Sequence, residues 1–98
     1  MRQHIENFLS YIKIQKNYSD LTVKAYSIDL GQFEEYLQNE KIDDISKIDK
    51  RIIRMYISYL SQSEMKKRSL SRKVATLKSF FKFTVREKII EKNPMSLI

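Results

Sequence analysis

Residues 19–37, SDLTVKAYSIDLGQFEEYL, place apolar side chains at alternating spacings of three and four residues. This spacing matches one face of an α-helix, so the segment predicts a helix with one buried side. Ser19 or Asp20 supplies an oxygen that accepts from the free N–H groups of a first helical turn, so we expect the helix to cover residues 20–39. The predicted buried face consists of Val23, Tyr26, Leu30, Phe33 and Leu37.

Three further helices follow from the same reasoning. Apolar residues recur at helical spacing near the N-terminus, after the turn expected at Asp43 and Asp44, and through the basic segment before Pro94. Asp49 is a suitable N-cap for the third helix, and the fourth is expected to start at Ser69 and to fade before the proline. The predicted helices cover about residues 2–16, 20–39, 49–62 and 69–88.

The composition favours an all-α fold. The chain has 98 residues with one glycine and one proline, whereas β-sandwiches and barrels need many turn residues. A chain of this length buries one modest core. We therefore expect one domain over residues 1–98, a compact bundle of four helices.

Several function classes are excluded by what the sequence lacks. The absence of cysteine excludes disulfides and thiolate metal sites and suits a reducing compartment, so we expect a cytoplasmic protein. No apolar run approaches the roughly 20 residues of a membrane span, so we expect a soluble chain without a membrane partner. Asp43 and Asp44 are adjacent turn residues without a third ligand, so we expect no metal and no cofactor.

The charge of the chain is concentrated near its C-terminus. Residues 66–88 contain nine Lys or Arg and one acid, Glu87, so this segment carries +8, against +7 for the whole chain. A solvated helix face usually mixes both signs, as the second predicted helix does. The one-signed segment therefore favours a nucleic-acid partner, with a merely solvated face as the alternative.

Small and basic residues lie opposite the apolar stripe of the fourth predicted helix. A one-sided cationic surface neutralises the phosphates of a duplex, and small side chains let a helix approach base edges in the major groove. Arg72 offers two parallel donors to a guanine, and the N–H groups at the helix start near Ser69 and Ser71 attract a phosphate. The outward residues are Arg72, Ala75, Ser79, Phe83 and Arg86, flanked by Thr76 and Lys82.

Two segments resemble a known family. Residues 19–37 resemble the second helix of the core-binding domain of tyrosine recombinases of the Xer and phage-integrase type, with Ser, Thr, Ala-Tyr, Asp-Leu, Phe and Leu in order. Residues 69–94, SLSRKVATLKSFFKFTVREKIIEKNP, resemble the fourth helix of that domain through Ser, Arg, a small residue, Leu, a basic residue, Phe-Phe and Asn-Pro. The resemblance covers essentially the whole chain. It implies a SAM-like domain that forms half of a C-shaped clamp, the other half being a larger C-terminal catalytic domain absent from this chain.

The resemblance implies a role in DNA recombination and integration, with the second and fourth helices in the major groove of a recombination half-site. It adds Thr22, Lys24 and Ser27 on the second helix to the candidates from charge. Expected partners are double-stranded DNA and other recombinase protomers on synapsed DNA, while the isolated domain is expected to be monomeric. The candidate DNA-binding residues are Arg72, Thr76, Ser79, Lys82, Arg86, Lys66, Lys67, Arg68, Ser69, Ser71, Thr22, Lys24 and Ser27.

No catalytic residue is expected in this chain. The family's chemistry uses a nucleophilic tyrosine with arginines, a lysine and histidines that stabilise charge and move protons. The one histidine, His4, lacks the family's His-x-x-Arg pattern, and we expect it to be frayed and exposed. Tyr26 and Tyr56 belong to apolar stripes, and no basic cluster surrounds the other tyrosines. The chain alone is expected to cut nothing, whereas the parent protein is expected to transfer DNA strands.

Two alternatives remain open. A small helical transcription regulator would also be basic, but would bind specifically without a second domain, usually as a dimer on a palindrome. A helical protein-interaction module would use the apolar residues Ile14, Ile28 and Phe83, and DNA would not compete with its partner.

Overall fold

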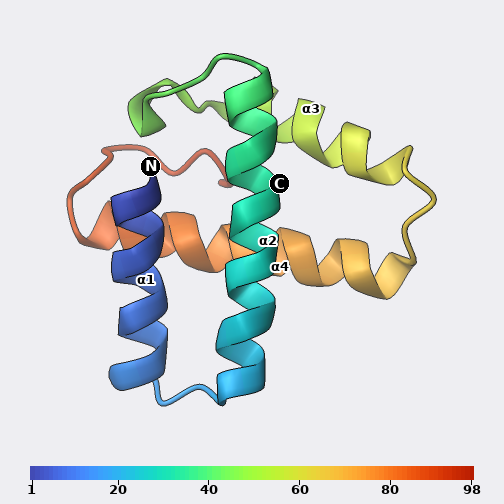
Figure 1. Ribbon diagram of the computed structural model, residues 1–98. Coiled ribbons are helices and arrows are strands. Elements are labelled where there is room, and N and C mark those ends of the chain that lie inside the picture. The colour runs from blue at the N-terminus through green and yellow to red at the C-terminus, as the bar shows by residue number, and fades with distance from the viewer. The chain divides into compact units, whose positions relative to one another are not determined.

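The computed structural model describes all residues from Met1 to Ile98 and contains helices but no strands (Figure 1). The predicted all-α class with four helices is confirmed. The chain divides into two compact units, Met1–Asp43 and Asp44–Ile98. No helix combines the length and the apolar character needed to cross a membrane. The elements are α1 (Arg2–Ile14), α2 (Asp20–Asn39), the short 3-10 helix η1 (Ile45–Lys47), α3 (Lys50–Ser61) and α4 (Lys67–Arg86).

The first unit is a helical hairpin in which α1 and α2 lie side by side and run in opposite directions (Figure 1). α1 ends at Ile14, two residues earlier than predicted, and Asn17 takes a left-handed φ of 55° in the connection. Asparagine visits this conformation more readily than most residues do, so it is suited to the turn. The Ser19 hydroxyl caps α2 by accepting from the Thr22 N–H at 3.2 Å.

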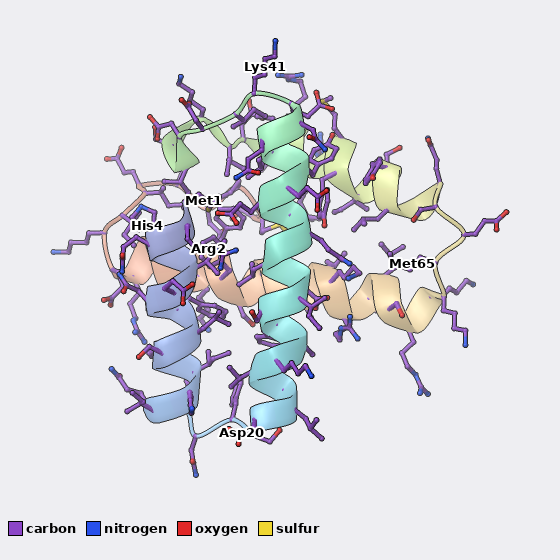
Figure 2. All side chains as sticks on the ribbon, in the orientation of Figure 1. Met1, Arg2, His4, Asp20, Lys41 and Met65 are labelled. Carbon is purple, nitrogen blue, oxygen red and sulfur yellow. The ribbon has the colours of Figure 1, made fainter.

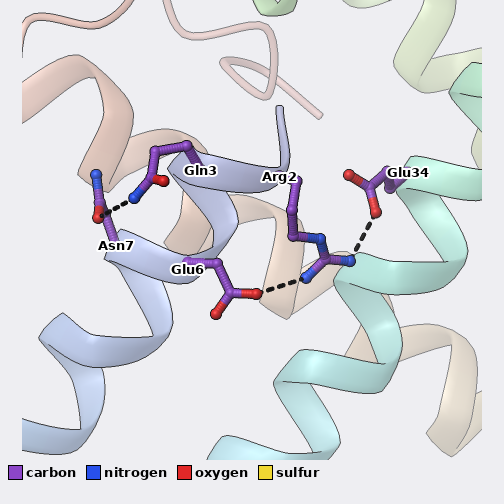
Figure 3. A network of polar contacts seen from close by, with 5 residues as sticks. All are labelled: Arg2, Gln3, Glu6, Asn7 and Glu34. Atoms are coloured by element: carbon purple, nitrogen blue, oxygen red, sulfur yellow. Dashed lines mark hydrogen bonds and ion pairs between the residues drawn. The ribbon is translucent and has the colours of Figure 1, made fainter.

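Aromatic packing and one ion-pair network hold the hairpin. The Tyr26 ring of α2 stacks on Phe8 of α1 with a centroid separation of 6.3 Å. The Arg2 guanidinium donates to Glu34 on α2 at 2.6 Å and to Glu6 on its own helix at 3.4 Å, as Figure 3 shows. The network therefore fixes the start of α1 against the second half of α2. Buried apolar residues of the two helices are Ile5, Phe8, Ile12, Leu30, Phe33 and Leu37.

The second unit consists of α3, α4 and the segments around them. A loop that contains Met65 leads from α3 into α4 (Figure 2). Asp49 caps α3 as predicted, since its Oδ1 accepts from the Ile52 N–H at 2.9 Å. Beyond α4, Pro94 and Met95 are buried, and the Met95 N–H donates to Asn93 Oδ1 at 2.8 Å, whereas Leu97 is exposed. Buried residues on the two helices include Ile53, Tyr56 and Leu60 of α3 and Leu77, Phe80 and Phe81 of α4.

Two local predictions are wrong. α4 begins at Lys67 rather than at Ser69, with Lys66 as an N-cap that makes no side-chain capping bond. Lys and Arg are strong helix formers, so residues 67 and 68 join the helix without a serine cap. His4 is not frayed, because it lies inside α1 and is half-buried. Its burial and, to a smaller extent, the nearby N-terminal amino group lower the pKa of His4.

Candidate nucleic-acid interface

One side of α4 is a continuous cationic surface. Five basic residues lie on this side, and all of them are exposed: Arg68, Arg72, Lys78, Lys82 and Arg86. At 100° per residue they fall within an arc of about 120° around the helix axis. Ser71, Ala75 and Ser79 lie inside this arc, so small side chains separate the cations. No Asp or Glu occurs between residues 65 and 86. We call this surface the α4 basic face, and it consists of Arg68, Ser71, Arg72, Ala75, Lys78, Ser79, Lys82 and Arg86.

The apolar side of α4 sets the direction of this face. Leu77, Phe80 and Phe81 are buried with at most 1% of their surface exposed, so the helix has one strongly preferred rotation about its axis. That rotation turns the basic residues outward over about 27 Å, the length of the eighteen steps from residue 68 to residue 86 at 1.5 Å per residue. The surface is therefore long enough to meet several successive phosphates of a duplex.

Lys73 does not belong to the α4 basic face. It is only 5% exposed and lies on the packed side of the helix, where its aliphatic stem is covered. Of the nine basic residues in segment 66–88, the other eight are exposed. The charge count from the sequence therefore overstates the cationic surface by one.

The N-terminus of α4 adds backbone donors to the cations. The first intrahelical bond runs from the Leu70 N–H to the Lys66 carbonyl at 3.0 Å, so the N–H groups of residues 67–69 precede the helical ladder. Such amides and the helix dipole favour an anion, and Lys66, Lys67 and Arg68 are all exposed beside them. Ser69 is half-buried within this turn. Ser71 lies one turn further on, so it offers its exposed hydroxyl but not a free amide.

Thr76 is unsuited to the contact with DNA that the sequence predicts. Its surface is 0% exposed, and its hydroxyl donates to the Arg72 carbonyl at 3.0 Å. The residue lies among the packed side chains, beside Leu77 and one turn before Phe80. Ser79, by contrast, is half-buried at the edge of the α4 basic face, and Lys82 is exposed on it.

A Thr76→Val substitution is therefore expected to leave duplex affinity unchanged within about twofold, because a buried side chain cannot reach a base. Valine keeps the volume and removes the hydroxyl, so the free energy of unfolding should change by about 1 kcal/mol. Fluorescence anisotropy on a labelled duplex measures the first effect and urea unfolding the second. A tenfold loss of duplex affinity in a variant that remains folded would show that Thr76 does contact DNA.

Phe83 also departs from its predicted outward position. It is 6% exposed, and the Arg86 guanidinium lies 5.8 Å from its ring centroid. The ring is therefore unavailable as the protein-contact residue of the interaction-module alternative. Arg86 also approaches the Glu87 carboxylate at 3.5 Å, and both side chains are about half-exposed, so this pair is screened and weak.

The three candidates on α2 do not share a face. The Thr22 hydroxyl accepts from Ser19 Oγ at 2.9 Å within the N-cap, and Thr22 lies about 160° around the helix from Lys24. Lys24 is exposed and Ser27 is half-buried on the opposite, outward side. The outward α2 face, defined by Asp20, Lys24, Ser27, Ile28, Gly31 and Glu35, carries one cation and two anions, so it lacks the one-signed charge of the α4 basic face.

No three His, Cys, Asp or Glu side chains lie together as metal ligands. The geometry thus presents one exposed cationic helix face with small residues between its cations. Over residues 5–88 the sequence matches the family described as phage integrase, N-terminal SAM-like domain. The chain belongs to this family. The resemblance stated from residues 19–37 and 69–94 is thereby confirmed.

Relatives of this SAM-like domain include tyrosine recombinases. The chain is 38% identical over 90 residues to tyrosine recombinase XerC of Anoxybacillus flavithermus, covering 92% of the chain and 30% of that protein. It is 41% identical over 95 residues to tyrosine recombinase XerC of Leptospira interrogans, covering 96% of the chain and 30% of that protein. It is 38% identical over all 98 residues to tyrosine recombinase XerD of Staphylococcus epidermidis, covering 33% of that protein. The chain thus spans about a third of the length of these relatives.

Proposed function

We propose that this chain is the DNA-binding part of a site-specific tyrosine recombinase and that it holds a recombination half-site with α4 and α2. The observation that carries the proposal is the α4 basic face, which has five exposed cations and no acid in its span. Membership of the SAM-like family and the tyrosine recombinases among its relatives support the same proposal.

Phosphate neutralisation is the source of affinity in this proposal. Each cation of the α4 basic face that meets a phosphate releases condensed counterions, which favours binding whatever the base sequence. Residues 66–69 fix the helix end on a phosphate through backbone N–H groups and positive charge. These contacts set the register of the helix along the groove.

Base recognition resides nearer the middle of the α4 basic face. Arg72 presents a planar guanidinium that donates two parallel hydrogen bonds to guanine O6 and N7. Ala75 and Ser79 follow at one-turn intervals, so the helix axis comes close to the base edges there. Lys24 and Ser27 add contacts from the outward α2 face.

The chain itself performs no strand transfer in this proposal. Cleavage and exchange belong to a catalytic domain that lies outside these residues, and the parent protein acts with further protomers on synapsed DNA. The setting is the cytoplasm, where such a protein resolves chromosome dimers during segregation or moves a mobile element. The chain alone binds as a monomer.

Salt dependence tests this proposal. The chain is titrated against a labelled random-sequence duplex by fluorescence anisotropy between about 30 and 200 mM salt. Four to six neutralised phosphates predict a slope of log K against log salt of about −4 to −5. A folded chain that shows no binding at low salt would refute the proposal. Binding as a dimer to a selected palindrome would instead favour a transcription regulator.

A further inference from the structure

The outward face of α2 exposes two large aliphatic side chains to solvent. Leu21 is 81% exposed and Ile28 is 50% exposed. They lie seven residues apart, which brings them to the same side of the helix, and Lys24 lies between them. Ile28 therefore projects from the same surface as the two α2 residues, Lys24 and Ser27, that remain candidates for DNA contact.

Gly31 extends this surface by one turn and is not required by the fold. It lies in the interior of α2 without a positive φ, and a Cβ atom built on it meets nothing within 4 Å. Glycine lowers helix propensity, so alanine would suit the isolated helix better. The missing side chain leaves space above the backbone for a group outside the chain.

The charges of this surface leave recognition to short-range contact. Asp20 and Glu35 carry negative charge within about 60° of Lys24 around the helix, so two anions outnumber one cation and the face does not attract phosphates at long range. An exposed isoleucine gains free energy only by covering another apolar group. In the major groove, the C5-methyl group of thymine is the apolar group among the base edges.

We propose that Ile28 reads a thymine methyl group in the major groove, and that Gly31 allows the backbone of α2 to approach the DNA closely. This inference rests on the proposed function, since it requires α2 to face a duplex. It makes Ile28 a specificity-determining residue, because a cytosine at the same position presents no methyl group. Two aliphatic side chains are too few for a stable protein interface, which takes about 20 to 30 residues per side, so DNA fits the face better than a second copy does.

The test begins with selection from a duplex pool containing about 20 random base pairs, using the 98-residue chain at low salt. Each thymine of the selected duplex is then replaced singly by deoxyuridine, which removes only the methyl group. At one thymine the parent chain should lose about fourfold in affinity, the value expected for one buried methyl-sized group. Ile28→Ala should bind the thymine and deoxyuridine duplexes equally.

Matched variants isolate the contact. Ile14→Ala removes the same atoms from an isoleucine of α1 that is 73% exposed, and it should keep the full methyl effect. Gly31→Ala should weaken binding of the selected duplex by about tenfold while raising the melting temperature, because the new methyl group obstructs the DNA and favours the helix.

Three outcomes would overturn the inference. A chain that binds no duplex refutes the proposed function and this inference together. A chain that binds DNA with the same methyl response in the parent and in Ile28→Ala refutes only the inference. Ile28→Ala could also change the oligomeric state, measured by sedimentation, and leave the methyl response unaltered. That result would show that the outward α2 face contacts a second copy of the chain instead of DNA.

Discussion

Replacing Arg72 and Lys82 together by alanine is expected to weaken duplex binding by about 100-fold at about 50 mM salt. Both side chains are exposed on the α4 basic face, ten residues or about 2.8 turns apart. A random-sequence duplex offers Arg72 no fixed guanine, so both side chains act there as phosphate contacts. Their loss removes about two units from the slope of log K against log salt, and counterion release alone then accounts for the lost affinity. Anisotropy titrations of parent and variant across the same salt series measure both quantities.

The matched control changes the same net charge elsewhere in the second unit. Arg51→Ala with Arg54→Ala removes two exposed cations from α3, and it should leave both affinity and salt slope near the parent values. Equal losses in the two double variants would mean that overall charge, rather than the α4 basic face, attracts the duplex. If the Arg72 variant melts early, Lys78→Ala with Lys82→Ala replaces it with the same expected change in slope.

Phe81→Ala is expected to lower the free energy of unfolding by about 3 to 5 kcal/mol. Phe81 is 0% exposed, and its ring meets Phe80 edge-on with a centroid separation of 5.1 Å. A chain of 98 residues has a total stability of about 5 to 15 kcal/mol, so this one truncation removes much of it. Urea unfolding followed by circular dichroism gives the value.

The neighbouring residue supplies the control for this core variant. Lys82 is exposed, and Lys82→Ala should change the free energy of unfolding by less than about 0.5 kcal/mol. The contrast between positions 81 and 82 reports directly on the rotation of α4. A Phe81→Ala chain as stable as the parent would place Phe81 outside the core and invalidate the orientation assigned to the α4 basic face.

Helix positions were predictable where a cap and an apolar period agree. Ser19 and Asp49 accept from the N–H groups three residues on, as their side-chain chemistry suggests, and both helices begin directly after them. The start of α4 was not predictable in this way, because Lys66 makes no capping bond. There the helix-forming side chains of residues 67 and 68 outweigh the preference of Ser69 for a cap.

The direction of the cationic surface was predictable, but its width was not. The period of the apolar residues in α4 fixes which side faces out, so Arg72, Lys82 and Arg86 are exposed as predicted. A helical projection assumes one narrow buried stripe, whereas Thr76 and Phe83 are also covered. The sequence does contain a signal for the wider stripe. Thr76, Phe80 and Phe83 follow one another at spacings of four and three residues, which places them along one side of the helix.

Photo-crosslinking from single cysteines determines whether α4 lies against the duplex. The chain has no cysteine, so Ser71→Cys and Ser58→Cys each provide one thiol for the same photoreactive label. Both serines are exposed, the first on the α4 basic face and the second on α3 of the same unit. With a random-sequence duplex at low salt, the label at position 71 should attach to DNA at least about tenfold more than the label at position 58, as expected for a phosphate contact confined to one face. Equal yields, or a higher yield from position 58, would contradict the assignment of α4 as the DNA-binding helix.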